Sequence, residues 1–298
     1  MEAITGRVLD IQQKIRERKS TSNDLLTERE VDCEICRDEC VCAVIEETGE
    51  RVPVGDMKLF DWSVHPPALK RHHVESCRCV PRKRVDKALK HSHISEEFRK
   101  RTFETFETQG KDKRIQMAYR LAKRYAETFE ERRGESKNWF GIVGAVGIGK
   151  THLLCAIANA LLSRGIFVRY FNFVTGFKEM FAKYDQGGQA VEEIRWELMT
   201  CEVLMIDDLA KGKFDRRAKS VGINKSVFDE IYALIDFRYE NNLPVIWSSE
   251  MYAELASDGV IGEATASRLF ERSYIADMTY KDGEPKGSLN HRLLGFEG

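Results

Sequence analysis

The sequence contains no run of apolar residues long enough to cross a membrane, which takes roughly 18 of them. Its longest apolar stretches, such as THLLCAIANALL, are short, and the N-terminal sequence MEAITGRVLDIQQKIRERKS lacks the unbroken apolar segment of a signal peptide. The net charge is −1, so the overall charge argues neither for nor against nucleic acid binding. Internal repeats and low-complexity segments are also missing. The lack of a membrane-spanning run and of a signal peptide predicts a cytoplasmic protein that does not act in a membrane.

The length of 298 residues is sufficient for one domain of ordinary size and a smaller module. Residues 1–30 are expected to form a helix, and a cysteine-rich region follows that contains prolines and shows no sustained period. From Ile94 onward the chain becomes regular. The sequence therefore predicts a small N-terminal domain over residues 1–92 and a larger domain over residues 93–298.

In the larger domain, short and nearly all-apolar segments alternate with segments of helical period. Strands are expected over residues 139–144, 167–172, 203–208, 244–249 and 274–278. Helices are expected over residues 115–129, 150–165, 174–184, 190–200 and 227–241. This alternation is typical of an α/β fold in which helices cover both faces of a parallel sheet. A five-stranded parallel sheet is the predicted core.

The segment GAVGIGKT, from Gly144 to Thr151, fits the pattern G-x-x-x-x-G-K-[ST] between a strand and a helix. Gly144, Gly147 and Gly149 let backbone N–H groups turn toward phosphates, at the positive end of the helix dipole. Lys150 is expected to reach the β- and γ-phosphates, and the Thr151 hydroxyl to hold Mg²⁺. The segment predicts a site for ATP or GTP.

A second part of the same site is the apolar strand VLMIDD, which ends in Asp207 and Asp208. Asp207 is expected to hold Mg²⁺ together with Thr151, and Asp208 lies where a base that orients the attacking water is found. The other interpretation of Asp208 is a carboxylate that caps a helix or loop.

Four of the eight cysteines lie in the stretch CEICRDECVC, residues 33–42. In a reducing compartment such a cluster indicates a metal site before it indicates disulfides. The spacing favours a zinc site with two pairs of ligands, which are Cys33, Cys36, Cys77 and Cys79. Cys40 and Cys42 could replace one pair, and His72 or His73 could replace one sulfur. Cys155 and Cys201 are expected to be small core residues.

Four segments together resemble the DnaC/DnaI-type helicase loaders of bacteria and phages, which are AAA+ ATPases related to the IstB-type transposition helpers. These segments are GIVGAVGIGKTHLLCAIANALLSRG, VLMIDDLAKG, IYALIDFRYENNLPVIWSS and ASRLFERS. The resemblance implies an AAA+ P-loop domain that follows a zinc-binding domain. It also implies ATP-dependent loading of a hexameric replicative helicase onto single-stranded DNA.

The resemblance further implies roles for individual residues. Arg268 matches an arginine finger that reaches a neighbouring subunit's γ-phosphate, which requires self-association; the other interpretation is a surface arginine. His152 follows the phosphate loop as in the family and is expected to take part in nucleotide binding. Ser248, or else Glu250, matches the first sensor of hydrolysis. Asp208 stands where most AAA+ proteins have Glu, and its shorter side chain predicts slow turnover.

DNA contacts are predicted in a basic loop directly after the second motif, with a solvated charged loop as the equal alternative. Its basic residues are Lys211, Lys213, Arg216, Arg217 and Lys219. Lys178, Phe181 and Lys183 offer further contacts, although Phe181 also fits a core position. Arg292 is a weak match to a second sensor.

Three hypotheses about function follow. In the first, the N-terminal helix and zinc module bind the helicase and the AAA+ domain acts as a nucleotide switch. In the second, the protein is an IstB-type helper that binds duplex DNA and a transposase. In the third, it is a nucleotide-gated adaptor without useful hydrolysis.

Overall fold

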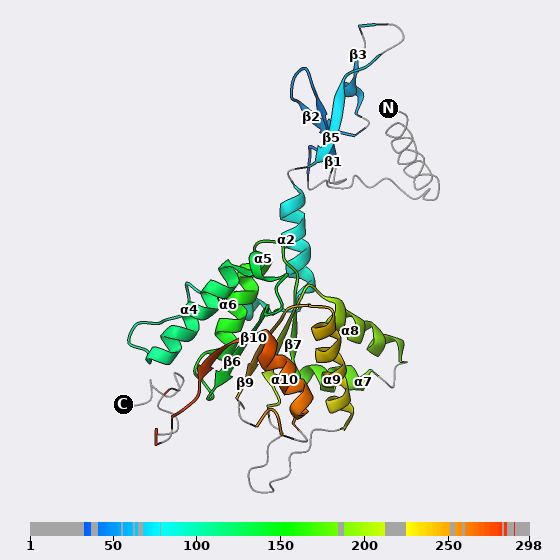
Figure 1. The fold of residues 1–298 in the computed structure, drawn as a ribbon. Coiled ribbons are helices and arrows are strands. Elements are labelled where there is room, and N and C mark those ends of the chain that lie inside the picture. Colours follow the sequence, from blue (N-terminus) through cyan, green and yellow to red (C-terminus); the bar gives the residue numbers. More distant parts are fainter. Residues whose placement is uncertain are drawn as a thin grey trace. The chain divides into compact units, whose positions relative to one another are not determined.

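The computed structural model describes most of the chain. The described residues are 33–36, 41–54, 56–61, 63–64, 68–77, 79–183, 188–211, 225–250, 254–257, 260–281, 283–284 and 289. The chain divides into two compact units, Met1–Val80 and Pro81–Gly298 (Figure 1). The helix predicted over residues 1–30 lies outside the described residues.

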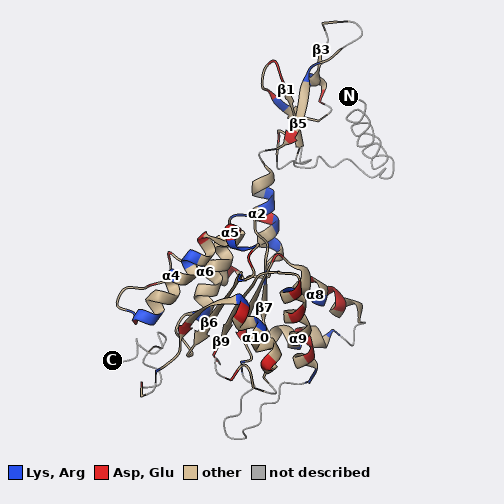
Figure 2. Cartoon of the chain, in the orientation of Figure 1, with Lys and Arg blue, Asp and Glu red and all other residues tan. Residues whose placement is uncertain are grey.

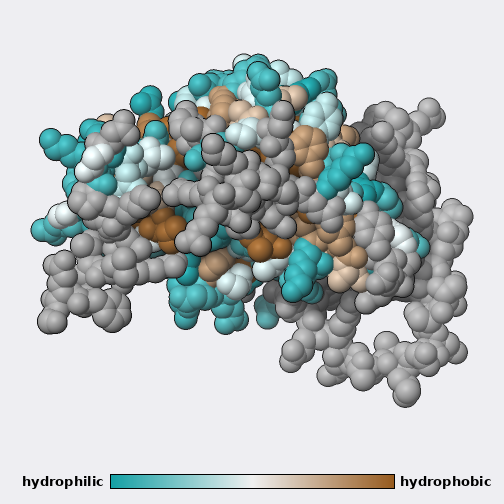
Figure 3. Space-filling view, turned by 90° about the horizontal axis from the view of Figure 1, so that it is seen from below, coloured by the Kyte–Doolittle hydropathy of each residue, from teal (hydrophilic) through white to brown (hydrophobic). Residues whose placement is uncertain are grey.

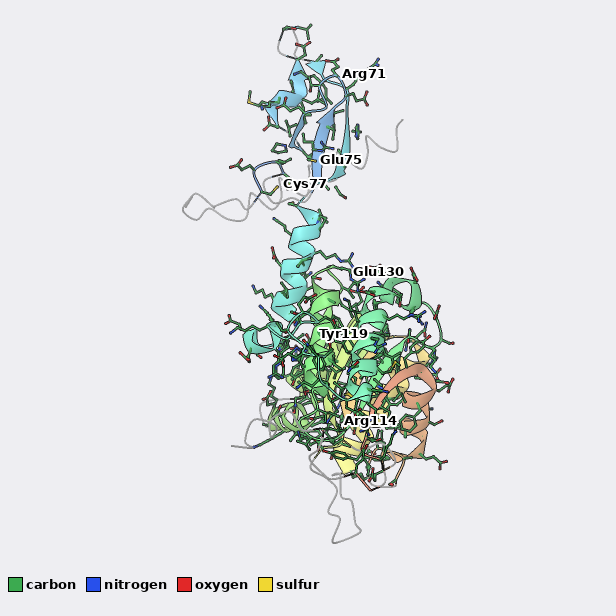
Figure 4. All side chains as sticks on the ribbon, turned by 90° about the vertical axis from the view of Figure 1, so that its left-hand side faces the viewer. Arg71, Glu75, Cys77, Arg114, Tyr119 and Glu130 are labelled. Atoms are coloured by element: carbon green, nitrogen blue, oxygen red, sulfur yellow. The ribbon has the colours of Figure 1, made fainter. Side chains whose placement is uncertain are left out.

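The first unit contains a small antiparallel sheet in the order β2-β1-β5. Its strands are β1 (Val41–Ile45), β2 (Arg51–Pro53) and β5 (His72–Ser76), and β5 lies between the labelled Arg71 and Cys77 in Figure 4. A short 3₁₀ helix, Met57–Leu59, precedes the paired strands β3 (Phe60–Asp61) and β4 (Ala68–Leu69). The sequence analysis described residues 48–73 as irregular. Strands of two to five residues are too short to show a period of two.

The second unit starts with four helices. They are α2 (Val80–His91), α3 (Glu96–Arg99), α4 (Lys113–Glu127) and α5 (Phe129–Arg132). Ala88 of α2 is buried in the core of this unit, and Arg84 Nε donates to Gly165 O at 2.8 Å. These contacts explain why the units divide at Val80, whereas the sequence analysis placed the boundary near Ser92.

The main sheet has five parallel strands in the order β10-β6-β9-β8-β7. The strands are β6 (Trp139–Gly144), β7 (Val168–Asn172), β8 (Val203–Leu209), β9 (Val245–Ser249) and β10 (Ser273–Met278). The predicted five-stranded parallel sheet is therefore confirmed. The side chains of successive strand residues alternate between two hydrophobic cores, for example Trp139 and Phe140 of β6.

Helices cover both faces of this sheet. Besides α4, the covering helices are α6 (Lys150–Leu162), α7 (Phe173–Ala182), α8 (Gln189–Thr200), α9 (Lys225–Glu240) and α10 (Gly262–Arg272). One core joins α4 and α6 to the sheet, and the other joins α7, α8, α9 and α10 to its opposite face. Figure 2 shows basic residues along α4 and acidic residues along α8.

The surface of the described residues is mixed in polarity. On the face in Figure 3, hydrophobic side chains form separate patches among hydrophilic ones. Among the described helices, none is long and apolar enough to span a membrane.

Candidate nucleotide site and cysteine cluster

The phosphate loop connects β6 to α6 and depends on three glycines with positive φ. Their φ angles are 147° for Gly144, 78° for Gly147 and 96° for Gly149. A Cβ on Gly149 would also lie 2.8 Å from the ring of Phe106. Only glycine adopts such conformations without strain, so the loop can turn its N–H groups toward the start of α6.

Lys150 is the first residue of α6 and is only 6% exposed. Its Nζ donates to Gly144 O at 2.9 Å and to Ala145 O at 2.7 Å, so the ammonium group is held inside the loop. Burial lowers the pKa of Lys150, since desolvation disfavours the charged form. Phosphate oxygens would give this ammonium group negatively charged hydrogen-bond partners.

Asp208 of β8 lines the pocket over the phosphate loop, and Asp207 contacts Thr151 of that pocket, because the strand is irregular at this point. Ile206 pairs with Trp247 and Leu209 pairs with Ser249, so β8 contains one extra residue here. Asp208 has a φ of 58°, in the left-handed region. In a regular strand, Asp207 and Asp208 would point to opposite faces of the sheet. The bulge instead places Asp208 on the pocket lining, while Asp207 hydrogen-bonds to Thr151.

Asp207 is 2% exposed and lies between two hydroxyl groups. Its Oδ1 accepts from Thr151 Oγ1 at 3.0 Å and from Ser248 Oγ at 2.7 Å. Burial raises the pKa of Asp207, and these hydrogen bonds act in the opposite direction. The separation of the Thr151 and Asp207 oxygens is close to the ~2.9 Å expected between neighbouring ligands in octahedral magnesium. The two side chains therefore fit the predicted Mg²⁺ site.

Ser248 connects the two aspartates. Besides donating to Asp207, its hydroxyl accepts from the backbone N–H of Asp208 at 3.0 Å. Glu250, the alternative sensor residue, instead forms an ion pair with Lys211. The geometry favours Ser248 over Glu250 as the residue that could sense the state of these carboxylates, and that role stays a prediction.

A pocket of about 420 Å³ lies over the phosphate loop. One wall is formed by Val146, Gly147, Gly149, Lys150, Thr151, His152, Asp208, Lys211 and Glu250. The other wall comes from the segment between α3 and α4, through Arg101, Thr105, Phe106, Glu107 and Lys111. The sequence analysis missed this second wall because the segment lacks a motif and a regular period.

Two residues of α6 hold the second wall in place. His152 Nε2 lies 3.0 Å from Thr102 O and 3.2 Å from Thr105 Oγ1. Asn159 Nδ2 donates to three carbonyl oxygens, which belong to Phe98, Arg99 and Arg101. His152, predicted as a nucleotide-binding residue, thus lines the pocket and also anchors its wall. Burial lowers the pKa of His152 and favours the neutral ring.

Arg268 lies on α10, against α9, and is not among the residues that line the pocket of its own chain. Its Nη2 lies 2.8 Å from Asp236 Oδ1, and its Nη1 donates to Ala264 O at 3.1 Å. The guanidinium carbon lies 5.8 Å and 5.4 Å from the ring centroids of Tyr232 and Tyr239. The position is compatible with action on a neighbouring subunit, which remains a prediction.

The predicted DNA contacts are only partly described. Lys211 lines the pocket, whereas Lys213, Arg216, Arg217 and Lys219 lie outside the described residues. Arg292, the weak match to a second sensor, lies outside them as well. Lys178 and Lys183 are exposed, and Phe181 is half-buried, with its ring stacked 5.9 Å from that of Phe177.

The structure brings the four predicted zinc ligands together. The sulfur atoms of Cys33, Cys36, Cys77 and Cys79 all lie within 4.8 Å of one another. The separations Cys33–Cys77 and Cys36–Cys79 are 3.7 Å and 3.5 Å, close to the ~3.8 Å edge of a tetrahedral zinc–thiolate site. The backbone N–H of Cys36 is the main cause that lowers the pKa of Cys33 to about 7. The donor set fits zinc.

The alternative ligands occupy other positions. Cys42 is buried in β1 beside the cluster, and burial raises the pKa of its thiol. His72 Nδ1 lies 2.9 Å from Lys70 O. Cys40 lies outside the described residues. In the second unit, Cys155 and Cys201 are buried as predicted, and burial raises the pKa of Cys155 to about 12.

Comparisons with known proteins agree with this geometry. The model of the family IstB-like ATP binding protein matches residues 82–280. Two proteins of Bacillus subtilis (strain 168) are similar to this chain. The uncharacterized protein YqaM is 34% identical over 227 residues, which cover 75% of this chain and 68% of YqaM. The phage-like element PBSX protein XkdC is 32% identical over 224 residues, 74% of this chain and 78% of XkdC.

Among solved structures, the crystal structure of the DnaC helicase loader is similar with a TM-score of 0.52. The match covers 62% of this chain and 99% of that chain at 21% sequence identity, so it shows a common fold. The predicted AAA+ fold is thereby confirmed, and the family match identifies an ATP-binding protein. The family match spans the phosphate loop, both aspartates and Arg268, and this chain belongs to the IstB-like ATP binding proteins, which are AAA+ ATPases.

Proposed function

We propose that this protein is an ATP-dependent loader that places a hexameric replicative DNA helicase onto single-stranded DNA in the cytoplasm. The observation that carries the proposal is the combination, in one chain, of a nucleotide site and a separate unit built around four cysteines. The first can act as a switch, and the second can present a zinc-stabilised surface to a partner. The fold shared with the DnaC helicase loader supports this assignment.

The nucleotide would bind through the phosphate loop and Lys150, with Thr151 and Asp207 as ligands of Mg²⁺. The metal ion would neutralise charge on the transferred phosphoryl group. Asp208 would orient the water that attacks the γ-phosphorus, and Ser248 would hold both aspartates in register. A short carboxylate on a bulged strand suits slow turnover, which a switch tolerates better than a motor does.

In the loading cycle, the ATP-bound protein would hold single-stranded DNA through its basic loop while the cysteine-rich unit holds the helicase. Hydrolysis or exchange of the nucleotide would then release the loader. Zinc in this scheme builds a surface and takes no part in catalysis.

A pull-down with the full chain tests the proposal. We expect a hexameric helicase to co-purify from a cytoplasmic extract with ATP and less of it with ADP, and the mass of the complex to be measurable by light scattering. Recovery of a different partner in place of the helicase would contradict the assignment.

The arginine finger is tested by subunit mixing. Arg268→Ala should lower DNA-stimulated ATP turnover by about tenfold or more without weakening ATP binding, because a finger acts on the transition state. Arg120→Ala, an exposed arginine of α4, is the matched control. Mixing Arg268→Ala with Lys150→Ala subunits should restore turnover, since each supplies what the other lacks. Without restoration, the intersubunit role is wrong.

The second candidate is a transposition helper of the IstB kind, which the family match itself favours. Such a helper would bind long duplex DNA in an ATP-dependent manner and recognise a transposase. Fluorescence anisotropy with single-stranded and duplex DNA of equal length separates the candidates. A nucleotide-gated adaptor would show binding with negligible turnover in the same preparations.

A further inference from the structure

Lys211 lies at the end of β8 and is shared by two carboxylates of the nucleotide pocket. Its Nζ lies 3.0 Å from Asp208 Oδ2 and 3.2 Å from Glu250 Oε1. Its backbone N–H also donates to Asp208 O at 3.0 Å, which closes a tight turn between the two residues. All three side chains line the pocket together with Lys150.

This arrangement restrains the residue assigned as the catalytic carboxylate. The backbone of Asp208 is fixed by the bulge and by its hydrogen bond to Ser248, and one carboxylate oxygen is engaged by Lys211. A carboxylate in a charge-assisted hydrogen bond is restrained in its orientation. The ion pair with Lys211 therefore fixes the Asp208 carboxylate and occupies an oxygen that could otherwise orient a water molecule.

We propose that Lys211 is a positioning residue that acts as a brake on hydrolysis, and that its ion pair with Asp208 must open before Asp208 can orient the attacking water. In the hydrolysis step, the water oxygen bonds to the γ-phosphorus and the bond to the β–γ bridging oxygen breaks. The proton of the water passes to Asp208 and then to phosphate, and ADP leaves. Glu250 provides the alternative partner that accepts Lys211 when the pair with Asp208 opens. This inference rests on the proposed role of Asp208.

The sequence position of Lys211 strengthens the case. It is the first basic residue of the sequence KGKFDRRAK, which also contains Lys213, Arg216, Arg217 and Lys219. A polyanion that attracts this basic run also attracts Lys211, and so favours opening of its pair with Asp208. The brake would thus connect DNA binding to turnover.

The test compares steady-state ATP hydrolysis without DNA for Lys211→Met, Lys211→Arg and Lys123→Met. Methionine keeps the length and removes the charge, so kcat should rise about threefold or more while KM for ATP changes less than about twofold. Lys211→Arg should stay close to the unmodified protein because it keeps the cation. Lys123→Met, an exposed lysine of α4, is the control and should change nothing.

An unchanged or lower kcat for Lys211→Met overturns the proposal, and a large rise in KM would identify Lys211 as a phosphate ligand instead. If Lys211→Arg behaves like Lys211→Met, the charge is not the restraint and the proposal is equally wrong. Thermal unfolding of each variant shows whether it is folded.

Glu250→Gln supplies an independent check. Without the competing carboxylate, Lys211 pairs with Asp208 alone, so kcat should fall about twofold or more. In a Lys211→Met background, Glu250→Gln should have no such effect, and an equal effect in both backgrounds contradicts the mechanism.

Asp208→Asn, measured in parallel, distinguishes a failure of the role proposed for Asp208 from a failure of the role proposed for Lys211. Full activity of this variant would show that the role of Asp208, and not only that of Lys211, is wrong. Neither result bears on helicase binding, which the pull-down measures.

Discussion

Asp208 combines an unusual backbone conformation with a proposed chemical role. Its φ of 58° is a conformation that Asp and Asn adopt more readily than residues with longer side chains. Most AAA+ proteins of the resembled class have Glu at this point. The irregularity in β8 coincides with this backbone conformation, which suits the shorter residue.

Ser248 is the residue whose removal should separate binding from hydrolysis. Ser248→Ala deletes the hydroxyl that donates to Asp207 and accepts from the N–H of Asp208, so we expect kcat to fall about tenfold or more with little change in ATP affinity. Nucleotide titration and steady-state turnover measure the two quantities.

Ser249→Ala is the matched control. Ser249 is also buried on β9, but its hydroxyl donates to Leu209 O at 2.8 Å. It should lower thermal stability by about 1 kcal/mol and leave kcat nearly unchanged. Equal kinetic effects of the two substitutions would mean that Ser248 acts only through packing.

At the scale of the elements, Arg238 is the structural anchor of the segment FRYENNLP, which covers the end of α9 and the turn that follows it. Arg238 is fully buried and donates to the carbonyl oxygens of Leu198, Met199 and Cys201 through Nη1 and of Pro244 through Nη2. It therefore joins the end of α8 to the start of β9. The segment that carried part of the family resemblance has a structural role here, and none of its residues lines the nucleotide pocket.

Arg238→Lys should destabilise the second unit although the charge is kept. Lysine cannot reach carbonyl groups on two sides with a planar fork, so some of them lose their partner. We expect the free energy of unfolding to fall by about 2–4 kcal/mol in chemical denaturation. A loss below about 0.5 kcal/mol would show that the four carbonyl contacts contribute little.

The pocket wall before α4 is attached to α6 through Asn159, and this attachment can be tested. Asn159→Ala removes three hydrogen bonds to the segment before α4, so the wall residues Arg101 and Phe106 lose their fixed position. KM for ATP should rise about threefold or more while kcat at saturation changes less. An unchanged KM would indicate that the wall does not contribute to binding.

At the scale of the whole molecule, zinc content should depend on four cysteines and not on their neighbours. Cys33→Ser should lose the metal, because three thiolates are a poor structural zinc site. The double variant Cys40→Ser/Cys42→Ser should keep one zinc per chain, as measured by elemental analysis. Loss of zinc from the double variant would overturn the ligand assignment.

Removal of zinc should also affect the two units differently. A chelator is expected to unfold the first unit, whose core consists of a few side chains around Ala43, Ile45, Val52 and Leu59. The second unit has its own two cores and should keep its ATP binding.

How much of the fold and of the candidate site could be predicted from the sequence depends on whether the residues form a motif or meet only through tertiary contacts. The phosphate loop and the strand before Asp207 have motifs that the backbone geometry requires, so their positions and the parallel sheet were predictable. The cysteine pairs were predictable from spacing. The bulge at Asp208 was not, because it depends on the register with β9. The wall before α4 was not predictable either, because tertiary contacts such as those with Asn159 and His152 bring its residues to the pocket.

The attachment of α2 has a mechanical consequence. The chain that leaves the cysteine-rich unit runs through α2, and Ser92 O then accepts from Tyr170 N of β7 at 2.8 Å, before the chain reaches α3 and residues 101–111. Arg84 of α2 also donates to Gly165 O. Tension applied to the N-terminal part of the chain is therefore borne first by α2 and the edge strand β7, and reaches Asn159 and His152 at the pocket wall only afterwards.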